Sequence, residues 1–272
     1  MFRSRGTAYD LSGPPGAPVL VLVHGLGLTR GTWDALVPVL AQDHRVLTYD
    51  LTGHGESAPP QETPSLTLLS GQLVRLMSDL AIDRATIAGF SLGGMINRRL
   101  AIDHPSCVAS LVILNSPHER SPEAQRLVEE RAAKTAEGGP AATIDATLER
   151  WFTPQFLKTA PDKVAQIRAW VLANNPATYA AFRQVLASGV IELIRPQPAI
   201  TAPTLVMTCE NDSGSTPAMS WAIASEIAGA ETLIVPGLQH LGLIERPELF
   251  TQPILRFLER SLPPPYLTGT KP

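Results

Sequence analysis

Short, almost entirely apolar runs recur along this chain and alternate with segments of helical period. Apolar runs of this kind suit strands that are covered on both faces, as in a parallel sheet. The predicted strands are Pro18–Val23, Arg45–Tyr49, Arg84–Ala88, Val108–Leu114, Thr204–Thr208 and Thr232–Val235. The predicted helices are Thr32–Ala41, Leu66–Leu80, Leu92–Asp103, Pro217–Ile227 and Glu248–Leu262. The alternation predicts an α/β fold with a mostly parallel, doubly wound sheet and right-handed crossovers.

The predicted helix 66–80 shows the helical pattern. Its apolar positions lie three and four residues apart and share one face: Leu66, Leu69, Leu73, Leu76 and Leu80. Thr63 and Pro64 precede this helix, and their residue types are typical of an N-cap and a first helical position. We therefore expect the helix to begin near Pro64.

The strand–helix alternation stops between residues 116 and 200. This segment is rich in alanine, glutamate and arginine, has helical period, and is interrupted by "GGP" at 138–140. We predict that residues 116–200 form a helical cap inserted over one end of the sheet. The α/β core then consists of residues 1–115 and 201–262, and residues 263–272 form a flexible tail.

Charge and length exclude several classes of partner. The 272 residues carry a net charge of −3 and no basic stripe, so nothing favours binding to nucleic acid or to an anionic membrane surface. No apolar run approaches the length of a membrane span, and the N-terminal "MFRSRGTAYDLSG" lacks the apolar region of a signal peptide. We therefore expect a cytoplasmic protein that acts on a small molecule.

No metal or cofactor site is predicted. CxxC and HExxH patterns are absent, and the histidines do not cluster at ligand spacing. Cys107 and Cys209 lie in or beside apolar runs, as expected of small buried side chains rather than of a disulfide. Gly53-x-Gly55-x-x-Ala58 resembles a dinucleotide-binding fingerprint, but two prolines follow at once and no helix begins at the glycines. We therefore predict no nicotinamide or flavin cofactor.

Gly89-Phe90-Ser91-Leu92-Gly93 matches the pattern G-x-S-x-G between a predicted strand and a predicted helix. In that context the serine sits on a sharp, strained turn that needs small neighbours, and its hydroxyl is exposed at the helix N-terminus. This interpretation predicts that Ser91 is a nucleophile and that the N–H of Leu92 stabilises a developing oxyanion. The alternative is an ordinary serine N-cap, with glycines that allow close packing of helix and strand.

His24-Gly25-Leu26-Gly27 forms a glycine-rich loop after the first long predicted strand. Its N–H groups can turn inward, and the N–H of Leu26 is the expected second oxyanion donor. An ordinary turn between a strand and a helix is the alternative. We expect His24 to hold this loop through a hydrogen bond rather than to act as a catalytic base.

A serine nucleophile needs a base, and the base needs an acid that orients it. His240 lies in a loop directly after a predicted strand, between two glycines, where no core role explains it; it is the predicted base. The stretch "TCENDSGSTP" ends the preceding strand and offers two acids. We predict Asp212, which lies further out on the loop, and Glu210 is the alternative.

Together these stretches resemble the α/β-hydrolase superfamily. The resemblance runs along nearly the whole chain, from "HGLG" through "DLTGHGESA", "GFSLGG" and "ENDSGSTP" to "GLQHLGLIERPELF". Within the superfamily the chain looks most like 3-oxoadipate enol-lactonase-like and small carboxylic ester hydrolases. The resemblance implies the α/β-hydrolase fold with Ser91 as nucleophile, Asp212 as acid, His240 as base, and Leu26 and Leu92 as oxyanion donors. One departure is the proline after the acid, which comes five residues on rather than four.

These residues predict a serine hydrolase that cleaves a small ester, lactone or related acyl substrate. The resemblance to enol-lactonases implies an acidic substrate, so basic residues near the turn and in the cap are candidates to bind its carboxylate. They are Arg98, Arg99, His118, Arg120 and Arg131. For each, a surface charge is the alternative. An amide or C–C bond hydrolase with the same triad, a non-catalytic receptor on this fold, and a homo-oligomer assembled through the cap are further alternatives.

Overall fold

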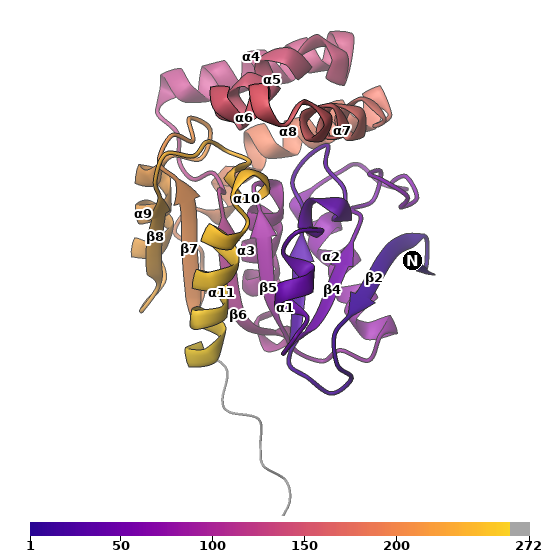
Figure 1. Ribbon diagram of the computed structural model, residues 1–272, viewed down its shortest axis with the longest axis vertical. Helices are drawn as coiled ribbons and strands as arrows, with labels where there is room; N and C mark the ends of the chain where they lie inside the picture. Colours follow the sequence, from indigo (N-terminus) through magenta and orange to yellow (C-terminus); the bar gives the residue numbers. More distant parts are fainter. Residues whose placement is uncertain (262–272) are drawn as a thin grey trace, which may run out of the picture.

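An eight-stranded sheet runs through the computed structural model, which describes residues 1–261. Its strand order is β1-β2-β4-β3-β5-β6-β7-β8. The strands are β1 (Phe2–Ser4), β2 (Thr7–Ser12), β3 (Val19–Val23), β4 (Arg45–Tyr49), β5 (Ala85–Phe90), β6 (Val108–Leu114), β7 (Thr204–Cys209) and β8 (Glu231–Val235). β3 to β8 pair in parallel, whereas β2 pairs antiparallel with β1 and β4. The predicted, mostly parallel α/β sheet is therefore confirmed (Figure 1).

Helices cover both faces of this sheet (Figure 1). The near face in that view carries α1 (Val37–Leu40) and α11 (Glu248–Ser261), and the far face carries α2 (Leu66–Asp79) and α3 (Leu92–Asp103). The remaining core helices are α9 (Pro217–Ser225), which packs against β7 and β8, and α10 (Gly242–Glu245). Every residue of β5 is buried, as expected of a strand covered on both sides.

The N-terminal hairpin of β1 and β2 was not predicted from the apolar runs. Its residues, "FRS" and "TAYDLS", are mostly exposed or half-buried, because an antiparallel strand at the sheet edge faces solvent on one side. β5 also differs from the prediction, since it extends past Ala88 through Gly89 and Phe90. The longer strand carries the chain directly to Ser91.

Two helix starts also differ from the predictions. The predicted helix 32–41 is instead a 3-10 helix, Arg30–Trp33, followed by the short α1. Pro38 lies in the first turn of α1 and lacks the N–H that one continuous helix would need there. The N-cap of α2 is Ser65 rather than Thr63, and its hydroxyl accepts a hydrogen bond from the N–H of Leu68 (3.0 Å).

Five α-helices between β6 and β7 lie across one end of the sheet, and we call them the cap helices (Figure 1). They are α4 (Pro122–Gly138), α5 (Ile144–Trp151), α6 (Pro154–Thr159), α7 (Pro161–Leu172) and α8 (Pro176–Ser188). Three of them begin with a capping residue followed by proline: Ser121-Pro122, Thr153-Pro154 and Asn175-Pro176. The capping side chain accepts a first-turn N–H, and proline fits the first position because no helical partner exists there for its missing N–H. The cap helices therefore have clear local starts, and they cover the ends of the strands that carry Ser91, Asp212 and His240.

Within residues 1–261, no helix is long and apolar enough to cross a membrane. The same residues contain no group of three or more His, Cys, Asp or Glu that could hold a metal ion. Cys107 is free and half-buried, and Cys209 is free and buried. The predicted tail, 263–272, lies outside the described residues, as does Leu262, the predicted last residue of the final helix.

Candidate active site

Ser91 occupies the turn between β5 and α3. Its backbone adopts φ 56° and ψ −112°, a conformation that costs a residue with a side chain on the order of 1–3 kcal/mol. Its hydroxyl makes no hydrogen bond to the first turn of α3, so the interpretation of Ser91 as an ordinary N-cap is wrong. The side chain instead lines a cavity beneath the cap helices.

Glycines surround Ser91 because this turn brings backbone against backbone. A Cβ on Gly89 would lie 2.1 Å from the carbonyl oxygen of Gly93, and a Cβ on Gly93 would lie 2.1 Å from that of Val23. Rotating a side chain cannot relieve either contact, since the atoms on the other side belong to the backbone. The two glycines of the G-x-S-x-G pattern are therefore steric requirements of this turn.

Three side chains form a hydrogen-bonded chain at the ends of parallel strands. His240 Nε2 lies 3.2 Å from Ser91 Oγ, and His240 Nδ1 lies 2.6 Å from Asp212 Oδ2. Ser91 follows β5, Asp212 follows β7 and His240 follows β8. Because the carboxylate can only accept, Nδ1 carries the proton and Nε2 is free to accept from the Ser91 hydroxyl. Glu210, the alternative acid, is exposed and accepts a hydrogen bond from the N–H of Gly237 (2.9 Å) instead.

A set of buried donors holds the Asp212 carboxylate. Oδ1 accepts from the N–H groups of Gly214 (2.9 Å) and Ser215 (3.0 Å), and Oδ2 accepts from Asn115 Nδ2 (2.9 Å) as well as from His240. Burial alone would raise the pKa of Asp212, but His240, Asn115 and the N–H of Ser215 together hold that pKa below its ordinary value. The carboxylate is therefore ionised and fixed in direction.

Asn115 is a site residue that sequence reasoning missed. It follows β6 directly, is completely buried, and adopts φ 46°, which asparagine tolerates better than most residues. Its Nδ2 also donates to Thr208 Oγ1 (3.3 Å) on β7. The sequence could have indicated this residue, because Asn115 is a polar amide that directly follows a buried strand. That strand lies next in the sheet to the one that carries Asp212.

The loop His24–Gly27 lies beside Ser91. A Cβ on Gly25 would come within 3.2 Å of Ser91 Cβ, and Leu26 lines the same cavity as Ser91. Leu92 is the first residue of α3, so its N–H is one of those that a helix leaves without an intrahelical acceptor. The two residues predicted as oxyanion donors are thus placed on either side of Ser91: one in the neighbouring loop and one next in the chain.

His24 fixes the start of this loop. It is completely buried, its Nε2 accepts from the N–H of Leu51 (3.0 Å), and its Nδ1 donates to the carbonyl oxygen of Gly25 (2.8 Å). Burial lowers the pKa of His24, so the ring is neutral at pH 7, as these two hydrogen bonds require. These contacts match the loop-holding role expected of His24.

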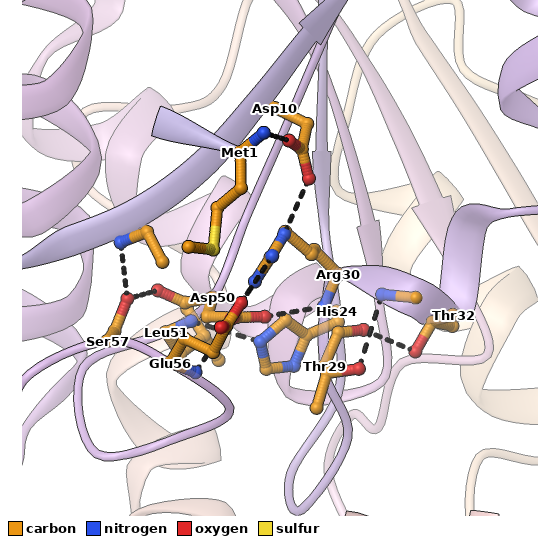
Figure 2. Close-up of polar contacts among 12 residues, drawn as sticks. Met1, Asp10, His24, Thr29, Arg30, Thr32, Asp50, Leu51, Glu56 and Ser57 are labelled. Carbon is orange, nitrogen blue, oxygen red and sulfur yellow. Dashed lines mark hydrogen bonds and ion pairs between the residues drawn. The ribbon is translucent and has the colours of Figure 1, made fainter. Parts of the chain in front are cut away.

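An ion-pair network anchors the far end of the loop (Figure 2). Arg30 lies at its centre: its backbone N–H donates to Asp50 Oδ1 (2.7 Å), and its guanidinium pairs with Asp50, with Asp10 (2.6 Å) and with Glu56 (2.5 Å). The Met1 ammonium pairs with Asp10 (2.9 Å). Asp50 is completely buried at the end of β4, so the network ties the loop to the sheet and to the N-terminal hairpin.

The cap helices contact the loop from the other side. Asn174, just after α7, donates from Nδ2 to the carbonyl oxygen of Gly27 (3.1 Å). Gly27 has φ 75°, and a Cβ there would lie 2.8 Å from the ring of Tyr179 on α8. The loop that carries Leu26 is therefore held by the sheet below and by the cap helices above.

A cavity of about 60 Å³ lies between Ser91 and the cap helices. Apolar side chains from the core and the cap form part of its wall, and Ser91 and His240 both face it. The cap also contributes four arginines to the lining: Arg120, Arg131, Arg150 and Arg183. Two of the five residues predicted to bind a substrate carboxylate, Arg120 and Arg131, thus reach this cavity.

The other three predicted binding residues point elsewhere, which corrects that prediction. Arg98 is buried and donates to two backbone carbonyl oxygens, at 3.0 and 2.7 Å, so it braces the start of α3. Arg99 pairs with Asp103 (2.6 Å), one turn along α3. His118 pairs with Glu226 (3.1 Å). None of the three lines the cavity that contains Ser91.

Sequence reasoning missed Arg150 on α5 and Arg183 on α8. Arg183 lies among Tyr179, Phe182 and Leu186, at the spacing of an apolar helix face. A charged residue on an otherwise apolar helix face could have indicated that Arg183 points into the protein. Burial lowers the pKa of Arg150 to about 10, with further lowering by nearby arginines, so its guanidinium still carries a full charge at pH 7.

The family model of the alpha/beta hydrolases matches residues 20–252. The chain belongs to this family. The crystal structure of the enol-lactonase from Burkholderia xenovorans LB400 resembles this α/β hydrolase with a TM-score of 0.85 and 32% identity, covering 93% of this chain and 96% of that one.

Two sequence relatives of the hydrolase are similar over most of their length. A putative carbamate hydrolase, RutD, from Stutzerimonas stutzeri is 29% identical over 92% of this chain and 96% of its own length. The 3-oxoadipate enol-lactonase 1 of Acinetobacter baylyi is 29% identical over 92% of both chains. The chain is therefore an α/β-fold hydrolase related to enol-lactonases.

Proposed function

We propose that this α/β hydrolase is a serine hydrolase that cleaves a small, acidic ester, lactone or related acyl compound through an acyl-enzyme on Ser91. The observation that carries the proposal is the chain Ser91–His240–Asp212, with contacts of 3.2 and 2.6 Å. Both distances are within the reach that a nucleophile, its base and an orienting acid need.

The chemistry follows from the direction of these hydrogen bonds. His240 Nε2 takes the proton of Ser91 Oγ as that oxygen attacks the carbonyl carbon, and the N–H groups of Leu26 and Leu92 stabilise the oxyanion. Nε2 then protonates the leaving group, which departs and leaves the acyl group on Ser91. A water molecule that His240 deprotonates attacks the acyl carbon and releases the acid. Throughout, Asp212 keeps Nδ1 protonated and stabilises the imidazolium.

The bond type is supported by the relatives. An enol-lactonase and a putative carbamate hydrolase are named for substrates in which a carbonyl carbon is bonded to oxygen or nitrogen. The acidic character of the substrate is supported by the arginine side chains that face Ser91. Substrate size is limited by the small cavity beneath the cap helices.

A substitution at Ser91 tests the proposal. Ser91→Ala should lower kcat for p-nitrophenyl acetate by about 10⁶, on the scale of other serine triads. Ser70→Ala, at a buried serine on α2 whose hydroxyl contacts only a backbone carbonyl of its own helix, is the matched control and should leave kcat unchanged. Activity of Ser91→Ala within tenfold of wild type would contradict the proposal.

A substrate panel distinguishes the bond types. The wild-type protein would be assayed with p-nitrophenyl esters, an enol-lactone, an amide and a vinylogous diketone. We expect turnover of the ester and the lactone. Preferential cleavage of the diketone would instead identify a C–C bond hydrolase, and no turnover with an unreactive Ser91 would identify a receptor.

A further inference from the structure

Four arginines line the cavity that contains Ser91, and no carboxylate among residues 1–261 lines it. Arg120 lies before α4, Arg131 on α4, Arg150 on α5 and Arg183 on α8. The acid of the triad, Asp212, lies behind His240 and does not line the cavity. The cavity is therefore strongly cationic, although the whole chain carries a net charge of −3.

Three of these guanidinium groups form no ion pair or hydrogen bond with residues 1–261, although Asp212 is near enough to attract Arg150. Among residues 1–261, no carboxylate pairs with any of the four, and the side chains of Arg131, Arg150 and Arg183 donate no hydrogen bond. Arg120 differs, because it donates to the carbonyl oxygens of Ala187 (3.1 Å) and Leu186 (3.2 Å) at the end of α8. Its contacts identify Arg120 as a brace of the cap.

Arg150 and Arg183 are the two arginines whose positions are best defined by their surroundings. Arg183 is only 6% exposed, and burying a charged group without a partner is unfavourable. Arg150 Nη1 lies beside Gly214, where an added Cβ would be 3.1 Å away, so this guanidinium reaches the loop that holds Asp212. Arg183 stands one helical turn from Tyr179, which contacts the loop that carries Leu26. The two guanidinium groups thus come from different cap helices, and that of Arg150 lies next to the loop that holds Asp212.

A single carboxylate carries one negative charge, whereas three cationic side chains without an ion pair to residues 1–261 line this cavity. A carboxylate makes its strongest contact with a single arginine, through two parallel N–H···O bonds. If one carboxylate bound Arg183 in this way, Arg150 and Arg131, both half-buried, would stay unpaired beside it. Two carboxylates would pair Arg183, which is buried, and Arg150, which lies beside the loop that holds Asp212.

We propose that the substrate carries two carboxylates in addition to the bond that Ser91 attacks, one bound by Arg150 and the other by Arg183. This inference rests on the proposed function and names the substrate class of the same site. The cavity of about 60 Å³ restricts that class to compact molecules. The substrate is therefore a compact ester or lactone that retains two free carboxylates, as one formed from a tricarboxylic acid does.

Binding to the wild-type protein tests the charge requirement without any substitution. Butyrate, succinate and sulfate would be compared by calorimetric titration at one ionic strength and as competitive inhibitors of p-nitrophenyl acetate hydrolysis. We expect succinate to bind at least tenfold more tightly than either of the other two. Equal affinities for butyrate and succinate would overturn the proposal, and so would equal affinities for sulfate and succinate, since one divalent anion would then suffice.

Two substitutions test the assignment to particular side chains. Arg183→Gln and Arg150→Gln should each weaken succinate binding at least tenfold, whereas Arg126→Gln should not change it. Arg126 is a matched control because it lies on α4, is largely exposed and pairs with Glu130. Succinate binding that survives both substitutions in folded protein would overturn the assignment. If neither variant folds, Arg150→Lys and Arg183→Lys take their place. These variants keep the charge but lose the paired contact, so we expect the same tenfold loss of succinate affinity.

Fluorophosphonate labelling separates this inference from the proposed function. If Ser91 is labelled in the wild-type protein and succinate shows no advantage over butyrate, the hydrolase proposal stands and the dicarboxylate inference fails. If succinate binds as expected and Ser91 is not labelled, the proposed function fails and the anion site remains.

Discussion

Replacing Asn115 with glycine tests whether a buried amide serves the chemistry or only the fold. Glycine tolerates the φ of 46° at this position, so the substitution removes the amide without the backbone strain that alanine would add. The bond lost runs from Nδ2 to Asp212 Oδ2 (2.9 Å), the same oxygen that contacts His240 Nδ1 (2.6 Å). The two N–H donors on Oδ1 remain, so the carboxylate stays in place but is less well directed.

The magnitude follows from the charge on the acceptor. A hydrogen bond to a charged group contributes about 1.5–3 kcal/mol, and each 1.36 kcal/mol changes a rate about tenfold. If that contribution is used to orient the carboxylate toward the imidazolium, kcat falls about 10- to 150-fold. KM for p-nitrophenyl acetate should change little, because Asn115 does not line the cavity. Steady-state kinetics and a thermal melt of the same preparation measure both effects.

Asn97→Ala is the matched control. Asn97 is also completely buried, and its Nδ2 donates to the backbone carbonyl oxygens of Ile87 (3.2 Å) and Val112 (3.0 Å), away from the triad. Its loss should destabilise the fold by about 1–3 kcal/mol and leave kcat unchanged. A kcat for Asn115→Gly within twofold of wild type would refute the reasoning, and so would an equal fall of kcat in both variants.

Three further substitutions test other parts of the structure. Gly89→Ala places a Cβ 2.1 Å from a backbone oxygen and should lower the unfolding free energy, measured by urea titration, by more than about 3 kcal/mol. Gly71→Ala on α2 is the control, because the added Cβ meets only the flexible end of Arg75. In the same titration it should be neutral or stabilising. Arg30→Met leaves buried Asp50 without its ion pair and should cost about 3–5 kcal/mol of unfolding free energy; a loss below 1 kcal/mol would contradict the anchoring role of the network. Burial lowers the pKa of His54 from 6.5 to about 3, so the unfolded chain takes up a proton that the folded protein excludes, and stability falls as the pH drops through this interval. The difference in unfolding free energy between wild type and His54→Gln should therefore change by about 2 kcal/mol between pH 7 and pH 5, and a pH-independent difference would show that His54 is not the group responsible.

Much of the fold could be predicted because its signals are local. The strands covered on both faces are near-continuous apolar runs, and the turn at Ser91 is marked by glycines whose Cβ atoms would collide with backbone. The hairpin β1–β2 has no such signal, since its strands are short and half-exposed. Pro38 shows the limit of helical period alone, because a favourable pattern over 32–41 ignored the missing N–H.

Site residues could be predicted only where a residue capable of catalysis directly follows a predicted strand. Ser91, His240 and Asp212 each follow a parallel strand, and the structure brings them within hydrogen-bond distance. Arg150 and Arg183 reach the same cavity only because the cap helices pack over the sheet, and no spacing in the sequence expresses that packing. For the same reason the sequence could not tell Arg98, which braces backbone, from an arginine that faces the cavity.

The most direct test of the central claim is the mass of the protein during turnover. The wild-type hydrolase would be mixed with excess p-nitrophenyl acetate, quenched in acid within the first turnovers, digested and analysed by mass spectrometry. We predict an acetyl group on the peptide that contains Ser91, at up to one per chain, and none on that peptide in Ser91→Ala. Acetylation at another residue, or turnover by Ser91→Ala at the wild-type rate, would contradict the account.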